Sequence, residues 1–222
     1  MPAASFADIV ISPSNAGAVE IIQRWEDWQG TALCLVGPPA SGLGVLIKLW
    51  SEAAVAHLID AETFDLLTAS GVEQIASGRC AIDLAEAITN EDNLLTALNT
   101  IYQRQGRLLM TARNAPAAWD VTSADLASRL RALPTATIGP PDDEMVRKRL
   151  KAACRRRYLK LSKEETDYIA VRLERSYEAI EDYVQRLDFA VSESGRPPSI
   201  HLARSVLEEA ADANSCDGDL PD

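Results

Sequence analysis

The sequence predicts an α/β base with a parallel sheet between two helical layers, followed by a small all-helical lid. Over residues 1–138, short apolar runs alternate with helical patterns, as is typical of parallel three-layer folds. After the Gly139-Pro140-Pro141 break, only helical patterns follow. Apolar residues make up 47% of the 222-residue chain, which is enough to bury a core, so we do not expect the whole chain to be disordered.

The base elements follow from local periodicity. A first helix is expected after residues 12–15, and the run 31–36 that ends at Gly37 is a strand buried on both faces. The apolar stripe of the first helix comprises Ala18, Ile21, Ile22, Trp25 and Trp28. The next helix carries on its inner side Val45, Leu46, Leu49 and Trp50. Further strands are expected at 57–59, 80–82, 108–110 and 136–138. A helix with Leu94, Leu95, Leu98 and Ile101 precedes the run 108–110.

The rest of the chain is expected to be helical. Helices are predicted near 142–157, 163–173, 176–192 and 199–209. Residues 210–222 contain four Asp together with Asn, Gly and Ser, so we expect a disordered tail. The expected layout is a base domain over 1–138, a helical lid over 139–209 and an acidic tail over 210–222.

Charge and composition exclude several classes of function. The 33 acidic and 22 basic side chains give a net charge of −11, which disfavours duplex binding by the whole surface. No apolar run approaches the ~20 residues that span a bilayer, and the first residues lack a secretory signal. We therefore expect a cytoplasmic protein. The four cysteines form no C-x-x-C pair and the two histidines lie far apart, so we expect reduced thiols and no metal site.

One glycine-containing loop carries the chemistry. Gly37-Pro38-Pro39-Ala40-Ser41-Gly42-Leu43-Gly44 lies between a predicted strand and helix, as in the phosphate-binding P-loop G-x-x-x-x-G-K-[ST]. The two glycines let backbone N–H groups point at phosphate, next to a helix N-terminus. However, Leu43 replaces the lysine and Gly44 replaces the magnesium-binding hydroxyl. Two interpretations remain: a tight strand-to-helix turn, or a residual anion or nucleotide site. In either case we expect Leu43 to pack inward or cover the pocket.

The order and spacing of several segments resemble the AAA+ core of the bacterial replication initiator DnaA. The closest resemblance is to its shorter Hda-type regulatory relatives. The segments are Ser14-Asn15-Ala16, Trp25, Trp28, the loop 37–44, 94–99, 108–113 with Pro116, 125–130 and 138–142. The resemblance spans residues 5–209 and implies a nucleotide-binding AAA+ base followed by a helical lid. It includes no counterpart of the initiator's helix-turn-helix domain, so direct sequence-specific DNA binding is not expected.

The resemblance also implies roles for single residues. Asp83 matches the end of the Walker B strand, where it would support magnesium, but the next residue is Leu84 instead of an acid. Thr111 matches the sensor 1 residue, and Arg129 matches the arginine finger that reaches a neighbour's nucleotide. Glu178 occupies the position of the lid's sensor 2 arginine. The plainer alternatives are a helix cap for Asp83 and a surface salt bridge for Arg129.

These replacements decide the expected function. Loss of the lysine and the sensor 2 arginine would remove roughly 3–6 kcal/mol of phosphate binding, about 10²–10⁴ in affinity. Hydrolysis depends on the same charges. We therefore expect a pseudo-ATPase without a resident cofactor, which binds ADP or ATP with magnesium weakly if it binds them at all. An arginine finger acts on the nucleotide of a neighbouring protein, so the role expected for Arg129 does not depend on the chain's own phosphate site.

The leading hypothesis is a non-catalytic regulator of chromosomal replication initiation that contacts DnaA or a related AAA+ partner, with homo-oligomers as a further option. The first alternative is an Hda-type protein that binds ADP and stimulates hydrolysis of DnaA-bound ATP in trans. The second is an interaction scaffold outside replication, because fold does not fix function. The glutamine-and-leucine peptide that binds the sliding clamp in Hda-type proteins is not visible before Phe6, so clamp binding is not expected.

The segment 147–160 holds eight of the 22 basic residues. On a helix these residues leave Val146, Leu150 and Ala153 for the core. The segment is either a solvated lid face balanced by acids such as Glu164 and Glu165, or a docking surface for an acidic partner or DNA. The four tryptophans are expected to pack in or beside the core instead of forming a base-stacking platform.

Overall fold

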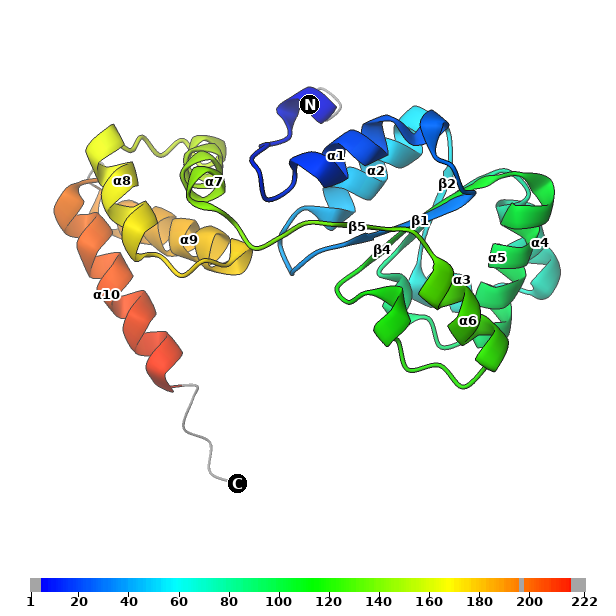
Figure 1. Ribbon diagram of the computed structural model, residues 1–222. Helices are drawn as coiled ribbons and strands as arrows, with labels where there is room; N and C mark the ends of the chain where they lie inside the picture. Colours follow the sequence, from blue (N-terminus) through cyan, green and yellow to red (C-terminus); the bar gives the residue numbers. More distant parts are fainter. Residues whose placement is uncertain (1–4, 196–197, 217–222) are drawn as a thin grey trace. The chain divides into compact units, whose positions relative to one another are not determined.

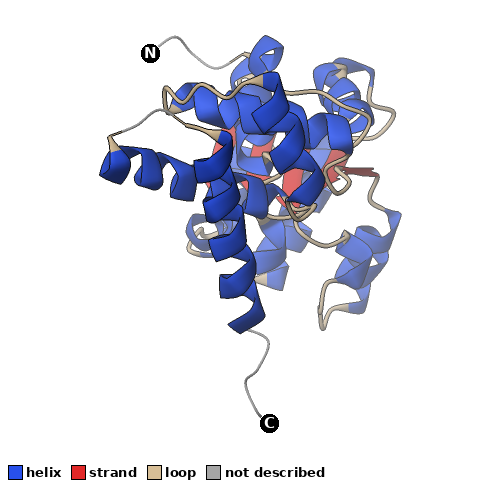
Figure 2. Ribbon diagram, turned by 90° about the vertical axis from the view of Figure 1, so that its left-hand side faces the viewer, coloured by secondary structure: helices blue, strands red, loops and turns tan. Residues whose placement is uncertain are grey.

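The computed structural model describes residues 5–195 and 198–216. It divides into two compact units, a base unit that ends at Gly139 and a helical unit that begins at Pro140 (Figure 1). Among the described residues, strands occur only in the base unit, as Figure 2 shows by colour. The described helices include none with the length and apolar character needed to cross a membrane.

The base unit contains a five-stranded parallel sheet, which confirms the predicted α/β class. Its strands are β1 (Ala32–Val36), β2 (His57–Asp60), β3 (Arg79–Asp83), β4 (Arg107–Ala112) and β5 (Thr135–Thr137). Their order across the sheet is β2-β3-β4-β1-β5, and every pair is parallel. Because parallel strands all end at one edge of the sheet, the residues after β1, β3 and β4 gather there. The register places Asp60 opposite Asp83.

Helices cover both faces of the sheet, so the fold has three layers (Figure 1). One face is covered by α1 (Ala16–Gln23) and α2 (Leu43–Ala54). The other is covered by α4 (Ala69–Ala76), α5 (Glu91–Arg104) and α6 (Ala124–Ala132). The short α3 (Ala61–Asp65) follows β2 directly. The described part of the unit, residues 5–139, also contains four single-turn 3₁₀ helices: η1 (Phe6–Asp8), η2 (Trp25–Asp27), η3 (Ala85–Ala87) and η4 (Pro116–Ala118).

The main core of the base unit lies between the sheet and α4–α6. Alternate strand residues such as Cys34, Ile82 and Met110 point into it, together with Leu126 and Leu130 of α6. Such alternation follows from the two-residue repeat of a strand. The opposite face of the sheet is covered by the apolar side of α2, where Trp50 is fully buried.

The apolar stripe predicted for the first helix is interrupted, because α1 ends at Gln23 and η2 follows. Within α1, Ile21 is 41% exposed, and Val45 of α2 is 48% exposed. Both residues were expected to face inward. The expected packing role of the tryptophans is confirmed. Trp28 stacks on Trp50 at a centroid distance of 5.8 Å, and Trp25 meets Trp50 edge-on at 6.2 Å.

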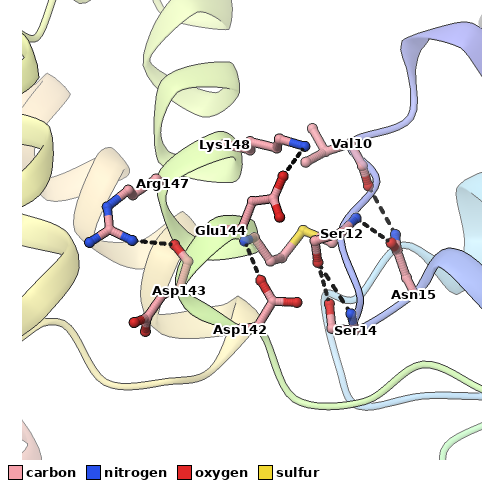
Figure 3. Close-up of polar contacts among 10 residues, drawn as sticks. Val10, Ser12, Ser14, Asn15, Asp142, Asp143, Glu144, Arg147 and Lys148 are labelled. Carbon is pink, nitrogen blue, oxygen red and sulfur yellow. Dashed lines mark hydrogen bonds and ion pairs between the residues drawn. The ribbon is translucent and has the colours of Figure 1, made fainter.

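The segment before α1 is fixed by a small polar cluster (Figure 3). The Asn15 amide donates to the Val10 carbonyl at 2.9 Å and accepts from the Ser12 N–H at 3.0 Å. The hydroxyls of Ser12 and Ser14 lie 2.8 Å apart. The Gly139 N–H donates to the Ser14 carbonyl at 2.8 Å, which attaches the last residue of the base unit to its start.

The helical unit contains α7 (Asp143–Arg156), α8 (Lys163–Arg172), α9 (Tyr177–Ser194) and α10 (Ile200–Cys216), close to the predicted bounds. Its core includes Val146, Leu150 and Ala153, as predicted. The Asp142 side chain caps α7 by accepting the Met145 N–H at 2.7 Å. Helix α10 continues through residues 210–216, which the sequence pattern assigned to the tail. The remaining tail residues, 217–222, lie outside the described residues.

Candidate functional site

The loop 37–44 has the sharp turn that a strand-to-helix connection requires. The Gly37 N–H still donates to the Ala112 carbonyl at 3.1 Å, and the Ser41 N–H donates to the Pro38 carbonyl at 3.2 Å. Ala40 and Gly42 have left-handed backbones, with φ of 57° and 106°. Gly42 is the N-cap of α2, so the loop ends at a helix N-terminus as predicted.

The side chains of the loop fill its interior. Leu43 is only 7% exposed, and its Cδ2 would lie 3.4 Å from a Cβ built on Gly37. The same Cβ would lie 2.9 Å from the Ser41 hydroxyl and 3.1 Å from the Ile138 Cβ, so a side chain at position 37 would force its neighbours to shift. Leu43 thus packs inward, as expected. The buried Ser41 hydroxyl has no hydrogen-bond partner in the described part of the chain.

Asp83 and Thr111 meet where β3 and β4 end. The buried Thr111 hydroxyl donates to Asp83 Oδ1 at 2.5 Å and accepts the Leu84 N–H at 2.8 Å. The other carboxylate oxygen, Oδ2, would lie 3.7 Å from a Cβ built on Gly44. The structure therefore brings together the end of the loop, Asp83 and Thr111. It also gives Leu84 a left-handed backbone, with φ of 53°.

A cavity of about 330 Å³ opens beside Gly44 and Asp83. It is lined by Gly44, Ile47, Lys48, Leu58, Ile59, Asp60, Thr63 and Asp83. Lys48 and Asp60 were not predicted as site residues. The signal for Lys48 is its spacing, one helical turn after Gly44. Asp60 lies there because β2 pairs with β3.

Asp60 has a structural role at the edge of this cavity. Its side chain accepts the Thr63 N–H at 2.7 Å and so caps α3. Hydrogen bonds from the Thr63 backbone and side chain lower the pKa of Asp60 from its ordinary value. Among the described residues, no group of three or more His, Cys, Asp or Glu side chains could hold a metal ion.

Arg129 lies on α6, and α6 covers the face of the sheet opposite α2 (Figure 1). Its side chain is 40% exposed, and its Nε lies 3.8 Å from Asp125 Oδ1, one turn earlier on the helix. The structure thus shows the surface ion pair of the plainer alternative, and the arginine-finger role of Arg129 stays a prediction. An exposed pair of this kind typically contributes under about 1 kcal/mol, so a partner can displace it.

Glu178 lies in the first turn of α9, where an acid favours the helix dipole. It is exposed and lines a groove of about 580 Å³ within the helical unit. The two arginines nearest in sequence have other partners, although Arg172 also lines this groove. Arg172 stacks over the Tyr168 ring at 3.8 Å, and Arg175 pairs with Asp143 at 2.6 Å.

The sequence matches no protein-family model and no curated protein. Solved structures match the fold. Domain III of the Thermotoga maritima replication initiation protein DnaA aligns with a TM-score of 0.76 and 15% identity, over 92% of this chain and 95% of that domain. An AMPPCP-bound DnaA from Aquifex aeolicus aligns with a TM-score of 0.70 and 16% identity, over 87% of this chain and 67% of that one.

A DNA replication initiation factor aligns with a TM-score of 0.72 and 15% identity over 86% of this chain. The alignment spans only 65% of the length of that protein. At these identities the likeness shows the fold alone, which is the AAA+ fold of DnaA's domain III.

Proposed function

We propose that this protein is a non-catalytic AAA+ regulator that acts on chromosomal replication initiation in the cytoplasm by contacting DnaA or a related AAA+ protein. One pair of observations supports the proposal: Leu43 is buried beside Gly37, and the Arg129 side chain on α6 is 40% exposed. The buried leucine replaces the phosphate-binding lysine in the chain's own site. The exposed arginine leaves a cation that can contact the nucleotide of a partner.

The residues at the loop do not fit a nucleoside triphosphate with magnesium. Leu43 occupies the loop interior in place of a lysine, and Gly44 offers no hydroxyl opposite Asp83. One oxygen of Asp83 is already bonded to Thr111. Lys48 is the single basic residue among those that line the adjacent cavity. Each missing charged hydrogen bond is worth about 1.5–3 kcal/mol, so nucleotide affinity should be at least about 100-fold weaker than in an intact site.

Arg129 supplies a guanidinium that can bind the phosphates of a partner's nucleotide. A guanidinium presents five N–H donors in a planar fork that matches phosphate oxygens. Its ion pair with Asp125 is long and exposed, so its loss would cost little. In this proposal Arg129 approaches the nucleotide of the partner protein and donates to its phosphate oxygens.

The test is the rate of ATP hydrolysis by purified DnaA in the presence of this protein. We expect Arg129→Ala to abolish any effect on that rate and Arg129→Lys to retain part of it. Arg131→Ala is the matched control, because Arg131 is an exposed arginine on the same helix, and it should behave like the unmodified protein. An undiminished effect of Arg129→Ala would refute the proposed finger.

The alternative is an Hda-type regulator that binds ADP and stimulates hydrolysis of DnaA-bound ATP in trans. The shape of the loop favours it: residues 37–44 still end at the N-terminus of α2 through the left-handed Gly42. Isothermal titration with ADP and magnesium separates the two proposals. Heat at micromolar ADP would favour the alternative, and no heat up to millimolar ADP would remove it.

A scaffold role outside replication is the third option, and self-association is compatible with all three. Capture of DnaA from a bacterial extract supports the first two proposals, and failure to capture it supports the third. Contact with the sliding clamp and sequence-specific DNA binding are not part of any of them.

A further inference from the structure

An exposed tyrosine in an unusual backbone conformation follows α7. Tyr158 is 94% exposed and has a φ of 59°, in the left-handed region that favours glycine. Its N–H donates to the Arg155 carbonyl at 3.2 Å, and the Leu159 N–H donates to the Cys154 carbonyl at 2.9 Å. These bonds close the helix end and need no aromatic ring. The fold of the helical unit therefore does not explain a tyrosine here.

Four of the eight cations in residues 147–160 have acidic partners. The ion pairs are Arg147–Asp167 at 3.0 Å, Lys148–Glu144 at 2.6 Å, Arg156–Glu181 at 3.0 Å and Arg157–Asp188 at 3.5 Å. Figure 3 shows the second of these. The acids differ from those expected, because Glu165 instead accepts the Ser162 N–H in the capping box of α8. Part of the basic segment is thus a balanced, solvated face.

Three basic side chains of the segment 147–160 differ from the other five. Within residues 5–195 and 198–216, the side chains of Lys151, Arg155 and Lys160 form no ion pair or hydrogen bond. Lys151 and Arg155 are one helical turn apart and therefore share a face of α7. Tyr158 follows in the closing turn, which buried Leu159 holds against the core. We call Lys151, Arg155, Tyr158 and Lys160 the Tyr158 patch.

We propose that the Tyr158 patch is a docking surface for a short acidic peptide segment of a partner protein. The cations match carboxylates, and the exposed ring offers a flat contact for an apolar or aromatic side chain. A contact between the Tyr158 ring and another molecule would explain both the exposure of the ring and the strained backbone. The patch lies on a different unit from Arg129, so it does not rest on the proposed finger.

Charge favours a short peptide over a nucleic acid. Residues 140–222 contain 14 basic and 18 acidic side chains, whereas nucleic-acid-binding domains are usually basic overall. The neighbouring pairs Arg156–Glu181 and Arg157–Asp188 also place carboxylates beside the patch. The phosphates of a long nucleic acid would be repelled by these carboxylates. A short peptide with a few carboxylates can pair with the cations of the Tyr158 patch alone.

The test is fluorescence anisotropy of a labelled oligoglutamate peptide with one central tryptophan, added to the full chain at low salt. We expect saturable binding that weakens as salt is added. Lys151→Ala and Arg155→Ala should each weaken it by about 1.4- to 5-fold. Tyr158→Gly should weaken it by about 2- to 13-fold and Tyr158→Phe should retain it. Glycine suits the backbone at 158, so Tyr158→Gly should fold normally.

The base unit offers matched controls. Tyr102, 65% exposed, and Arg104 are a tyrosine and an arginine on the surface of α5, and their alanine variants should bind the peptide like the unmodified chain. Absence of binding at low salt would overturn the proposal. Equal losses in the patch and control variants would do so as well. Tighter binding of oligothymidylate, weakened by the same patch substitutions, would assign the surface to nucleic acid instead.

Discussion

The Thr111 hydroxyl donates to Asp83 Oδ1 at 2.5 Å and accepts the Leu84 N–H at 2.8 Å, so one buried side chain joins the ends of two neighbouring strands. This arrangement gives both residues a structural role that needs no nucleotide. It also fixes the left-handed turn at Leu84, from which η3 begins.

Thr111→Val should therefore destabilise the protein. Valine keeps the shape of threonine but leaves Asp83 Oδ1 and the Leu84 N–H without this partner. Asp83 and Leu84 are half-buried, so we expect the free energy of unfolding by urea to fall by about 1 kcal/mol, near the lower end of the cost for a buried polar group that loses its partner. Thr111→Ser keeps the hydroxyl and should lose much less. Equal stability of the valine variant would show that the bond contributes nothing.

Two glycines of the loop should respond oppositely to alanine. Gly37→Ala places a Cβ 2.9 Å from the Ser41 hydroxyl and 3.1 Å from Ile138, and should destabilise the protein by about 1–3 kcal/mol. Gly44→Ala meets only an ordinary contact at 3.7 Å and adds helix propensity to α2. It should stabilise the protein by up to about 1 kcal/mol. Thermal unfolding of the two variants checks both signs, and a stable Gly37→Ala protein would contradict the tight packing around Leu43.

Restoring the consensus loop should restore phosphate binding. The double variant Leu43→Lys, Gly44→Thr supplies the lysine and a hydroxyl opposite Asp83 Oδ2, where the Cβ position is free of clashes. We expect ADP affinity in magnesium to rise by at least about 10-fold, the effect of one charged hydrogen bond, as measured by isothermal titration. Leu43→Ala is the control, since it empties the loop without adding charge. A gain in that control alone would mean that bulk, and not charge, limits binding.

Buried thiols should make the protein less stable in alkaline solution. Burial raises the pKa of Cys34 and of Cys80 from 9.0 to about 12, so both stay protonated in the native state when the unfolded chain ionises. Their contribution is complete below pH 9 and declines as pH rises toward 12. Urea unfolding at pH 8 and pH 10 should show the decline, roughly over the range where free thiols ionise. The Cys34→Ala, Cys80→Ala variant should show a flatter profile, and an unchanged profile would contradict the assignment.

The sequence predicted the parts of the fold whose signal is local and continuous. β1, β3 and β4 are buried apolar runs, and α5 and α7 have strong helical periodicity. Helices α3, α4 and α6 were not predicted, because the first two are short and depend on the side-chain caps Asp60 and Thr68, and the third has only two buried leucines. Short elements gain most of their stability from tertiary packing, which a single sequence does not reveal.

The candidate site was predictable only in part. The loop, Asp83 and Thr111 could be placed because each follows or ends a recognisable strand. Asp60 could not, since its position depends on the pairing of β2 with β3. Lys48 was missed although its spacing, one helical turn after Gly44, places it on the same side of α2. Spacing along a helix also leaves open which cations of α7 find partners on α8 and α9.

A site whose lysine is replaced by an inward-packed leucine should hold no nucleotide, and the protein should therefore act through contacts with other proteins. Isothermal titration of the unmodified chain with ATP and magnesium tests this claim most directly. We predict no binding heat up to millimolar ATP. A dissociation constant in the micromolar range would contradict the account.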